Sequence, residues 1–368
     1  MKLSKVYIVL IFLSLIFFSC KSKNDSPFSA KPVEMETGKI KVVIDPNVEM
    51  MMILGRLSGA SPYNFENEWE IPYIDDIDKY FNDFKNEPVI LQTRKNNLNH
   101  AKFPEYGIYL NQDISGYKLD IDNKNFIVQT AVNVQAKKIP YYAGQEYINS
   151  VRDFRIKSNF DDFFVNHEHE YEQLIDGYIK IVENYNFSKW LEVFYGTKTK
   201  ESLVIHLTYL TNRGNFSITT KNKKGNDELH AVIVAGSDKN SFLWEMSHEY
   251  SHCFTIKISE QLYKNKKIEK LFNKLFNTYN SIYRKRGYDS AFLILNETIT
   301  QACANKYLET ILSPSEMEEI NIEIIDDQKW IYTPQIAEFL DNYENNRKKY
   351  KTLDDFVPEL EKFIEGLE

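Results

Sequence analysis

The stretch SFLWEMSHEYSHCF, residues 241–254, contains two histidines, His248 and His252, that are separated by three residues. Its apolar residues recur three and four positions apart, which predicts an amphipathic helix. Residues four apart on a helix lie one turn apart on the same face, so both imidazoles can bind one metal ion. The stretch therefore predicts a metal-binding helix.

Glu249 follows His248 directly and is expected to face the open side of the metal. Zinc held by three protein groups keeps a fourth position for water and lowers the pKa of that water to about 7. Glu249 is then predicted to accept the proton of the water. The alternative is a chance match on an ordinary helix, and a third ligand downstream decides between the two.

Glu297 is the expected third ligand. It lies in AFLILNETITQACANKYL, residues 291–308, where the apolar residues predict a buried helix. A buried carboxylate is very unfavourable unless it is protonated, paired or bound to a metal. A metal shared with His248 and His252 accounts for it.

The two helices, with HExxH on the first and NExxxxA on the second, resemble those of the gluzincin metallopeptidases, which include thermolysin and many aminopeptidases. The resemblance implies that His248, His252 and Glu297 bind zinc and that Glu249 is the general base. The interval between the helices is longer here, and it holds the charged helical segment 259–287. The metzincin pattern is excluded, because CFTIKIS follows His252 and lacks its Gly and third His. The whole mature chain also resembles a family of bacterial lipoproteins known only as a domain of unknown function.

The N-terminus has the layout of a signal peptide: two lysines, an apolar run over residues 6–18, and then Cys20. The apolar run is shorter than the roughly 20 residues that a membrane-spanning helix needs. We expect residues 1–19 to be removed and Cys20 to become a lipidated terminus. The protein would then be membrane-anchored in the cell envelope, as a periplasmic or outer-membrane lipoprotein.

Without Lys2 and Lys5 the mature chain keeps 43 basic groups against 53 acidic groups, a net charge of −10. This charge argues against a nucleic-acid partner. Polar residues and prolines predict a flexible tether over residues 20–35.

The expected fold class is α+β, predominantly helical. An N-terminal α+β lobe is expected over residues 36–143 and a zincin-like catalytic domain over 144–368. Residues 39–44 predict a strand, and Pro46 begins a helix that ends at Gly59. The runs YGIYL (106–110) and NFIVQTAVNVQA (125–136) predict a small antiparallel sheet.

A three-stranded antiparallel sheet is predicted over residues 202–236, just before the metal helix. The resemblance to the gluzincins implies that residues 230–236 are the edge strand that pairs with substrate. It also makes Tyr332 and His230 candidate hydrogen-bond donors to the oxyanion. His167 and His169 are two residues apart, so they face different sides of a helix, and we interpret them as part of a solvated face. Cys253 and Cys303 are expected to be buried thiols, although a bond between them is geometrically conceivable.

Together these features predict an exported, lipid-anchored zinc peptidase that acts on peptides or proteins. Two alternatives stay open. One is a lipoprotein that binds peptides or glycans on the same fold without cleaving them, and the other is a zinc hydrolase of another amide or ester.

Overall fold

The computed structural model describes residues 28–96, 102–111, 125–126, 139–197, 203–212, 214–221 and 227–367. The expected signal peptide, Cys20 and most of the tether lie outside these residues. Within the described residues, no helix combines the length and the apolar character that crossing a bilayer demands.

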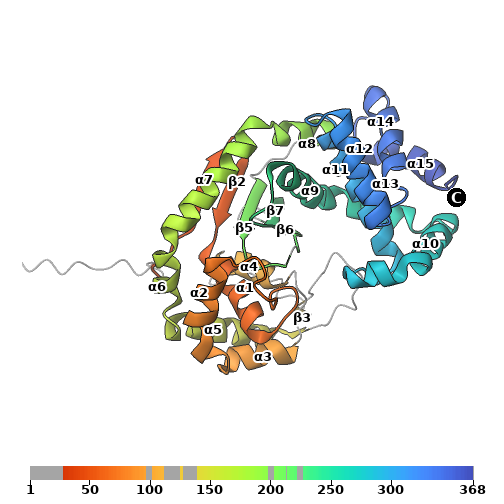
Figure 1. Ribbon diagram of the computed structural model, residues 1–368. Helices are drawn as coiled ribbons and strands as arrows, with labels where there is room; N and C mark the ends of the chain where they lie inside the picture. Colours follow the sequence, from red (N-terminus) through yellow and green to blue (C-terminus); the bar gives the residue numbers. More distant parts are fainter. Residues whose placement is uncertain are drawn as a thin grey trace, which may run out of the picture.

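The chain is predominantly helical and has a small sheet, which confirms the expected α+β class (Figure 1). The strands are β1 Val33–Thr37, β2 Ile40–Ile44, β3 Asn125–Phe126, β4 Ile139–Pro140, β5 Leu203–Thr208, β6 Phe216–Lys221 and β7 Asp227–Val234. The helices are α1 Pro46–Ser58, α2 Pro72–Tyr80, α3 Pro88–Asn96, α4 Lys102–Asn111, α5 Tyr141–Lys157, α6 Phe160–Asn166, α7 Glu168–Asn184, α8 Phe187–Tyr195, α9 Lys239–Leu262, α10 Lys266–Lys285, α11 Ala291–Leu308, α12 Pro314–Ile322, α13 Thr333–Phe339, α14 Asp341–Asn345 and α15 Leu353–Ile364, with short helical segments η1 Asn82–Phe84 and η2 Glu323–Asp327.

The main sheet is mixed and has the strand order β1-β2-β5-β7-β6. β2, β5 and β7 run parallel to one another, whereas β1 and β6 run antiparallel to their neighbours. The prediction of an antiparallel sheet over residues 202–236 was wrong in this respect. β5 is buried along its whole length, as is typical of a central parallel strand.

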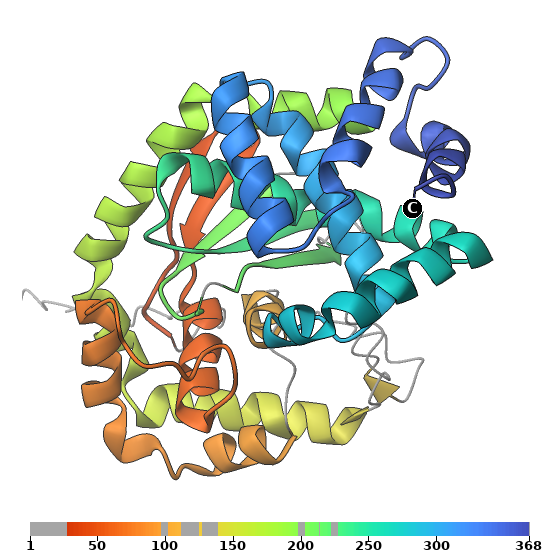
Figure 2. The same cartoon turned by 45° about the vertical axis from the view of Figure 1, so that its right-hand side comes forward.

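β7 lies between β5 and β6, so the prediction that residues 230–236 form the edge was also wrong. Among the described strands, β6 is at that edge. β1 and β2 come from the expected N-terminal lobe and pair with β5 from the expected catalytic domain. The two predicted parts of the chain therefore share one sheet, and α7 lies against β1 and β2 (Figure 2).

Helix α1 begins and ends where the sequence predicts. The Asp45 side chain accepts hydrogen bonds from the backbone N–H of Asn47 and Val48, at 2.8 and 3.1 Å, and thereby caps the first turn. Gly59 ends the helix with a φ of 79°, a left-handed conformation that glycine adopts without strain.

Residues 106–110, predicted as a strand, lie instead in helix α4. Gly107 brings α4 close to α1, because a Cβ at this position would lie 2.4 Å from the Cα of Val48. Close packing of two helices here overrides the local β preference of the aromatic residues. Of the predicted strand 125–136, Asn125–Phe126 pairs with Ile139–Pro140, and the rest lies outside the described residues.

Glu49 of α1 is a buried carboxyl group that lies far in sequence from His248 and His252. The Tyr73 hydroxyl donates a hydrogen bond to its Oε1 at 2.7 Å, and the Thr208 hydroxyl lies 3.5 Å from its Oε2. Burial raises the pKa of Glu49 to about 7. The carboxyl group is therefore protonated in the folded protein at mildly acidic pH.

We expect Glu49→Gln to stabilise the protein at pH 8 and to have little effect at pH 4. Since the pKa of Glu49 is higher in the folded state than in the unfolded state, its contribution to stability is complete below about pH 4.5 and is lost as the pH rises through 7. The loss amounts to about 3 kcal/mol, and a neutral amide avoids it. Urea unfolding of both proteins between pH 4 and 8 measures the difference, with exposed Glu318→Gln as control. A difference independent of pH would contradict the assignment.

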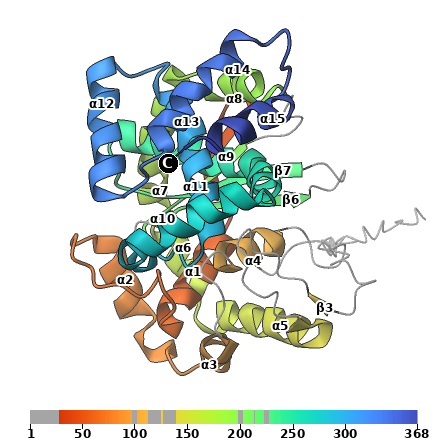
Figure 3. The same cartoon turned by 90° about the vertical axis from the view of Figure 1, so that its right-hand side faces the viewer.

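Helices α9 and α11 form the centre of the C-terminal half. α9, capped by Asp238, packs against β6 and β7, and α11, capped by Ser290 and buried throughout, packs along α9. The charged segment between them forms α10, which packs along α11 (Figure 3). Ser313 caps α12 in a capping box with Glu316.

Candidate metal centre

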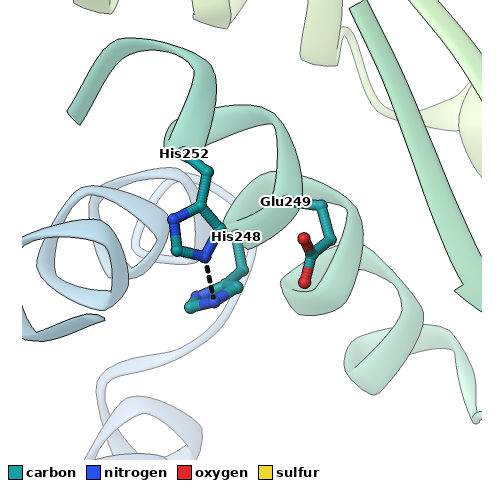
Figure 4. Close-up of side chains that lie close together, drawn as sticks. All are labelled: His248, Glu249 and His252. Atoms are coloured by element: carbon teal, nitrogen blue, oxygen red, sulfur yellow. Dashed lines mark hydrogen bonds between the residues drawn. The ribbon is translucent and has the colours of Figure 1, made fainter. Parts of the chain in front are cut away.

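Three side chains of α9 form a cluster with the geometry of a metal site. The ligand atoms of His248, Glu249 and His252 all lie within 4.8 Å of one another. Figure 4 shows the two imidazoles facing each other one turn apart, with the Glu249 carboxylate beside them. Nε2 of His248 lies 3.1 Å from Nε2 of His252. Within the described part of the chain, this is the cluster that could hold a metal ion.

Glu297 reaches this cluster from α11. Its two oxygens lie 3.2 Å from Nε2 of His248 and 3.5 Å from Nε2 of His252. In a tetrahedral site with zinc–nitrogen distances of about 2.0–2.1 Å, two nitrogen ligands lie about 3.3 Å apart. The two imidazole nitrogens lie at about this spacing from each other, and each lies at a similar distance from one oxygen of Glu297, so the three side chains could bind one ion.

The second ring nitrogen of His252, Nδ1, contacts two side chains of α11. The side-chain amide of Asn296 lies 3.2 Å from Nδ1 of His252, and the Thr300 hydroxyl lies 3.3 Å from the same atom. A metal at Nε2 places the proton of the imidazole on Nδ1, where it needs an acceptor. Asn296 Oδ1 is buried without a partner, and turning the amide over presents that oxygen to Nδ1. In this tautomer, Nδ1–H of His252 would donate a hydrogen bond to Oδ1 of Asn296.

We expect Asn296→Ala to weaken metal binding by about 10- to 100-fold, because outer contacts orient a ligating imidazole and set its proton. Competition titration with a metal chelator measures this change. Asn305→Ala is the matched control, since it removes another buried asparagine of α11, one that contacts Asn321 at 3.2 Å. Equal affinities in the two variants would show that Asn296 does not orient His252.

Burial and neighbouring groups shift the pKa values of the cluster. Burial lowers the pKa of His252 to about 4, which keeps this imidazole in the neutral form that binds metals. Burial also opposes protonation of His248, but the contact with Glu297 outweighs it and raises the pKa of His248. Burial opposes ionisation of Glu297, but its contacts with the two histidines outweigh it and lower the pKa of Glu297. Burial, together with the charge of Glu297, raises the pKa of Glu249 to about 8. A bound cation would lower it again, because an opposite charge favours the carboxylate.

Several neighbours of the cluster were not predicted from the sequence. Trp244 stacks on His248, with ring centroids 4.9 Å apart. Tyr288 is a hydrogen-bonding neighbour of Glu297, and Glu245 lies one turn before Glu249 on α9. Helical spacing is the signal that could have identified Trp244 and Glu245, because they precede His248 and Glu249 by four residues. Tyr288 lies in the turn before α11, where no periodic pattern marks it.

Of the two candidate oxyanion donors, His230 is not brought to the cluster. Ser217 of β6 contacts Cys253 of α9 at 3.3 Å, and the β6–β7 register puts His230 on the opposite face of the sheet from Ser217. Its ring nitrogens lie 3.1 Å from His206 and 3.0 Å from the Thr220 hydroxyl. Both nitrogens of His230 are therefore engaged within the sheet.

The second candidate, Tyr332, precedes α13, and its ring lies edge-on to Phe272 of α10 at 5.9 Å. Its role as an oxyanion donor stays a prediction. The two cysteines near the site, Cys253 and Cys303, are both free thiols, as expected; Cys303 is buried and Cys253 half-buried.

The histidines at 167 and 169 do not form a second metal site. His169 is exposed, as predicted, and its Nε2 lies 3.1 Å from the Gln173 amide. His167 is buried, so the prediction of a solvated face was wrong for this residue. Its Nδ1 lies 2.8 Å from the carbonyl oxygen of Phe163, and its ring packs against that of Phe163 at 4.4 Å. His167 therefore has a packing role between α6 and α7.

Comparison with known proteins identifies the family of this chain. No curated protein matches it, and no solved structure matches it. A family model described as "Domain of unknown function (DUF4932)" matches residues 40–363. This match begins at β2 and includes β2, β5, β7 and β6 of the main sheet and the candidate metal cluster. The chain therefore belongs to this family of domains of unknown function.

Proposed function

We propose that this protein is an exported, lipid-anchored zinc-dependent peptidase. The proposal rests above all on the convergence of His248, His252 and Glu297: the imidazole nitrogens lie 3.1 Å apart, and the Glu297 carboxylate lies 3.2 and 3.5 Å from them. Histidine nitrogen and carboxylate oxygen in this combination are usual ligands of catalytic zinc. Lipid attachment through Cys20, and with it a place in the cell envelope, is the part of the proposal that depends on the sequence alone.

Glu249 supplies the acid–base chemistry in this proposal. Among the described residues none donates a hydrogen bond to its carboxylate, and it lies beside the two imidazoles (Figure 4). A zinc ion held by the three ligands would acidify a water molecule and polarise a carbonyl group. Glu249 takes a proton from the attacking water and passes it to the leaving amine.

The edge strand β6 supports a peptide as the substrate. β6 pairs with β7 on one side, and its other side is unpaired among the described strands. An extended peptide can add to such an edge through backbone hydrogen bonds. Ser217 and Thr219 of β6 contact Cys253, the residue that follows His252, at 3.3 and 3.6 Å. A peptide on this edge would therefore run beside α9.

The test is incubation of the mature protein with a diverse peptide library, with and without a zinc chelator. We expect cleavage that stops with the chelator and returns with added zinc. Cleavage that is insensitive to the chelator would come from a contaminant. If no peptide is cleaved but simple amides or esters are, the protein is a zinc hydrolase of another class, and binding of peptides or glycans without turnover would identify a binding lipoprotein.

A further inference from the structure

Glu245 is a carboxylate of α9 that the proposed chemistry does not use. Its position four residues before Glu249 places both carboxylates on one face of the helix, a turn apart. The Ser237 hydroxyl lies 3.1 and 3.0 Å from its two oxygens, and the Asn215 side chain also hydrogen-bonds to it. Asn215 directly precedes the edge strand β6. Glu245 is thus held by neutral donors between the start of α9 and the start of β6.

Glu245 has polar partners but no basic partner in the described part of the chain. Burial raises its pKa to about 7, and a cation that contacts it would favour the carboxylate form. Glu297 forms its contacts with the two histidines. In the described part of the chain, no Lys or Arg pairs with Glu245 or Glu249, and Asp238 adds a further negative charge near Glu245.

Glu249 gives a second, independent indication of a ligand. Its side chain is buried, with 6% of the residue exposed, yet no described residue hydrogen-bonds to it. A buried polar group without a hydrogen-bond partner is unfavourable, so a molecule that binds beside Glu249 would supply one. Glu245 and Glu249 lie a turn apart without a basic partner among the described residues, which indicates that this molecule brings a positive charge.

We propose that Glu245 binds a cationic nitrogen of the substrate, either the free α-ammonium group or the side chain of a lysine or arginine. This inference rests on the proposed peptidase function and specifies its substrate class. Ser237 and Asn215 hold the carboxylate in place, so it meets the incoming cation without rearranging. A charge-assisted hydrogen bond to such a group strengthens binding by roughly 10- to 100-fold.

The experiment uses matched peptides on the zinc-loaded protein. One pair differs in a free or acetylated N-terminus, another has lysine or norleucine at one position, and a third has arginine or citrulline. For the wild type we expect kcat/KM to favour one cationic member by about 10- to 100-fold, mainly through KM. Glu245→Gln should bring this ratio close to one. Glu260→Gln, which removes an exposed carboxylate of the same helix, should keep it. The favoured pair identifies which cation is bound.

Calorimetric binding of the same peptides separates this inference from the proposed function. If the wild type prefers a cationic peptide in binding but cleaves none, the peptidase proposal fails and the role of Glu245 holds. If it cleaves peptides and no cation preference exists, or Glu245→Gln keeps the preference, the role of Glu245 is refuted. A protein that neither binds nor cleaves the peptides refutes both. Zinc content and thermal unfolding of Glu245→Gln show that the variant is folded, and Glu245→Asp should restore part of the preference.

Discussion

Replacing Glu249 with Gln should reduce turnover by about 10²- to 10⁴-fold while the protein keeps its metal and its affinity for substrate. This range is typical of the loss of a general acid or base. Glutamine has the size and shape of glutamate but cannot take a proton from water. Because Glu249 is buried without a hydrogen-bond partner among the described residues, the substitution breaks no observed contact. The measurement is single-turnover kinetics on a cleaved peptide, with metal analysis of the same samples.

The structure makes this variant decisive, because the ligand atom of Glu249 lies within 4.8 Å of those of both histidines. If Glu249 were itself a ligand, Glu249→Gln would lose metal together with activity. If it were structural, the variant would unfold at a lower temperature. Glu260→Gln, which removes an exposed carboxylate from the same helix, provides the reference for a simple change of charge.

Helical spacing accounts for the proximity of the two histidines that the sequence predicts. His248 and His252 are four residues apart on one helix, and this local geometry holds in any fold that keeps the helix. Glu297 was predicted by a different argument, the cost of burying a carboxylate in an apolar helix. The structure brings its oxygens to 3.2 and 3.5 Å from the two imidazoles. A strong local pattern and a burial penalty were sufficient to predict that these three side chains lie together, and their role as metal ligands stays a prediction.

The sequence does not predict what depends on long-range pairing. The antiparallel pairing of β6 with β7 was part of the predicted sheet, but nothing local indicates that β7 joins β5 in parallel and leaves β6 at the edge of the described strands. The register of β6 against β7 puts His230 on the face of the sheet away from α9. The same limit applies to residues 106–110. Their aromatic residues favour a strand, but Gly107 allows close packing against α1, and the segment is part of helix α4.

Replacing His248 or His252 with Ala should remove most of the bound metal. Each imidazole is one of the three proposed protein ligands, so its loss should cost more than the 10- to 100-fold in affinity that is typical of outer contacts. Glu297→Gln should also weaken binding, because it removes the charge that neutralises the ion. Elemental analysis after dialysis gives the metal content, which we expect to be one zinc per wild-type chain. His169→Ala, an exposed histidine outside the cluster, should leave the content unchanged. Full retention of metal in both His248→Ala and His252→Ala would place the metal elsewhere in the protein.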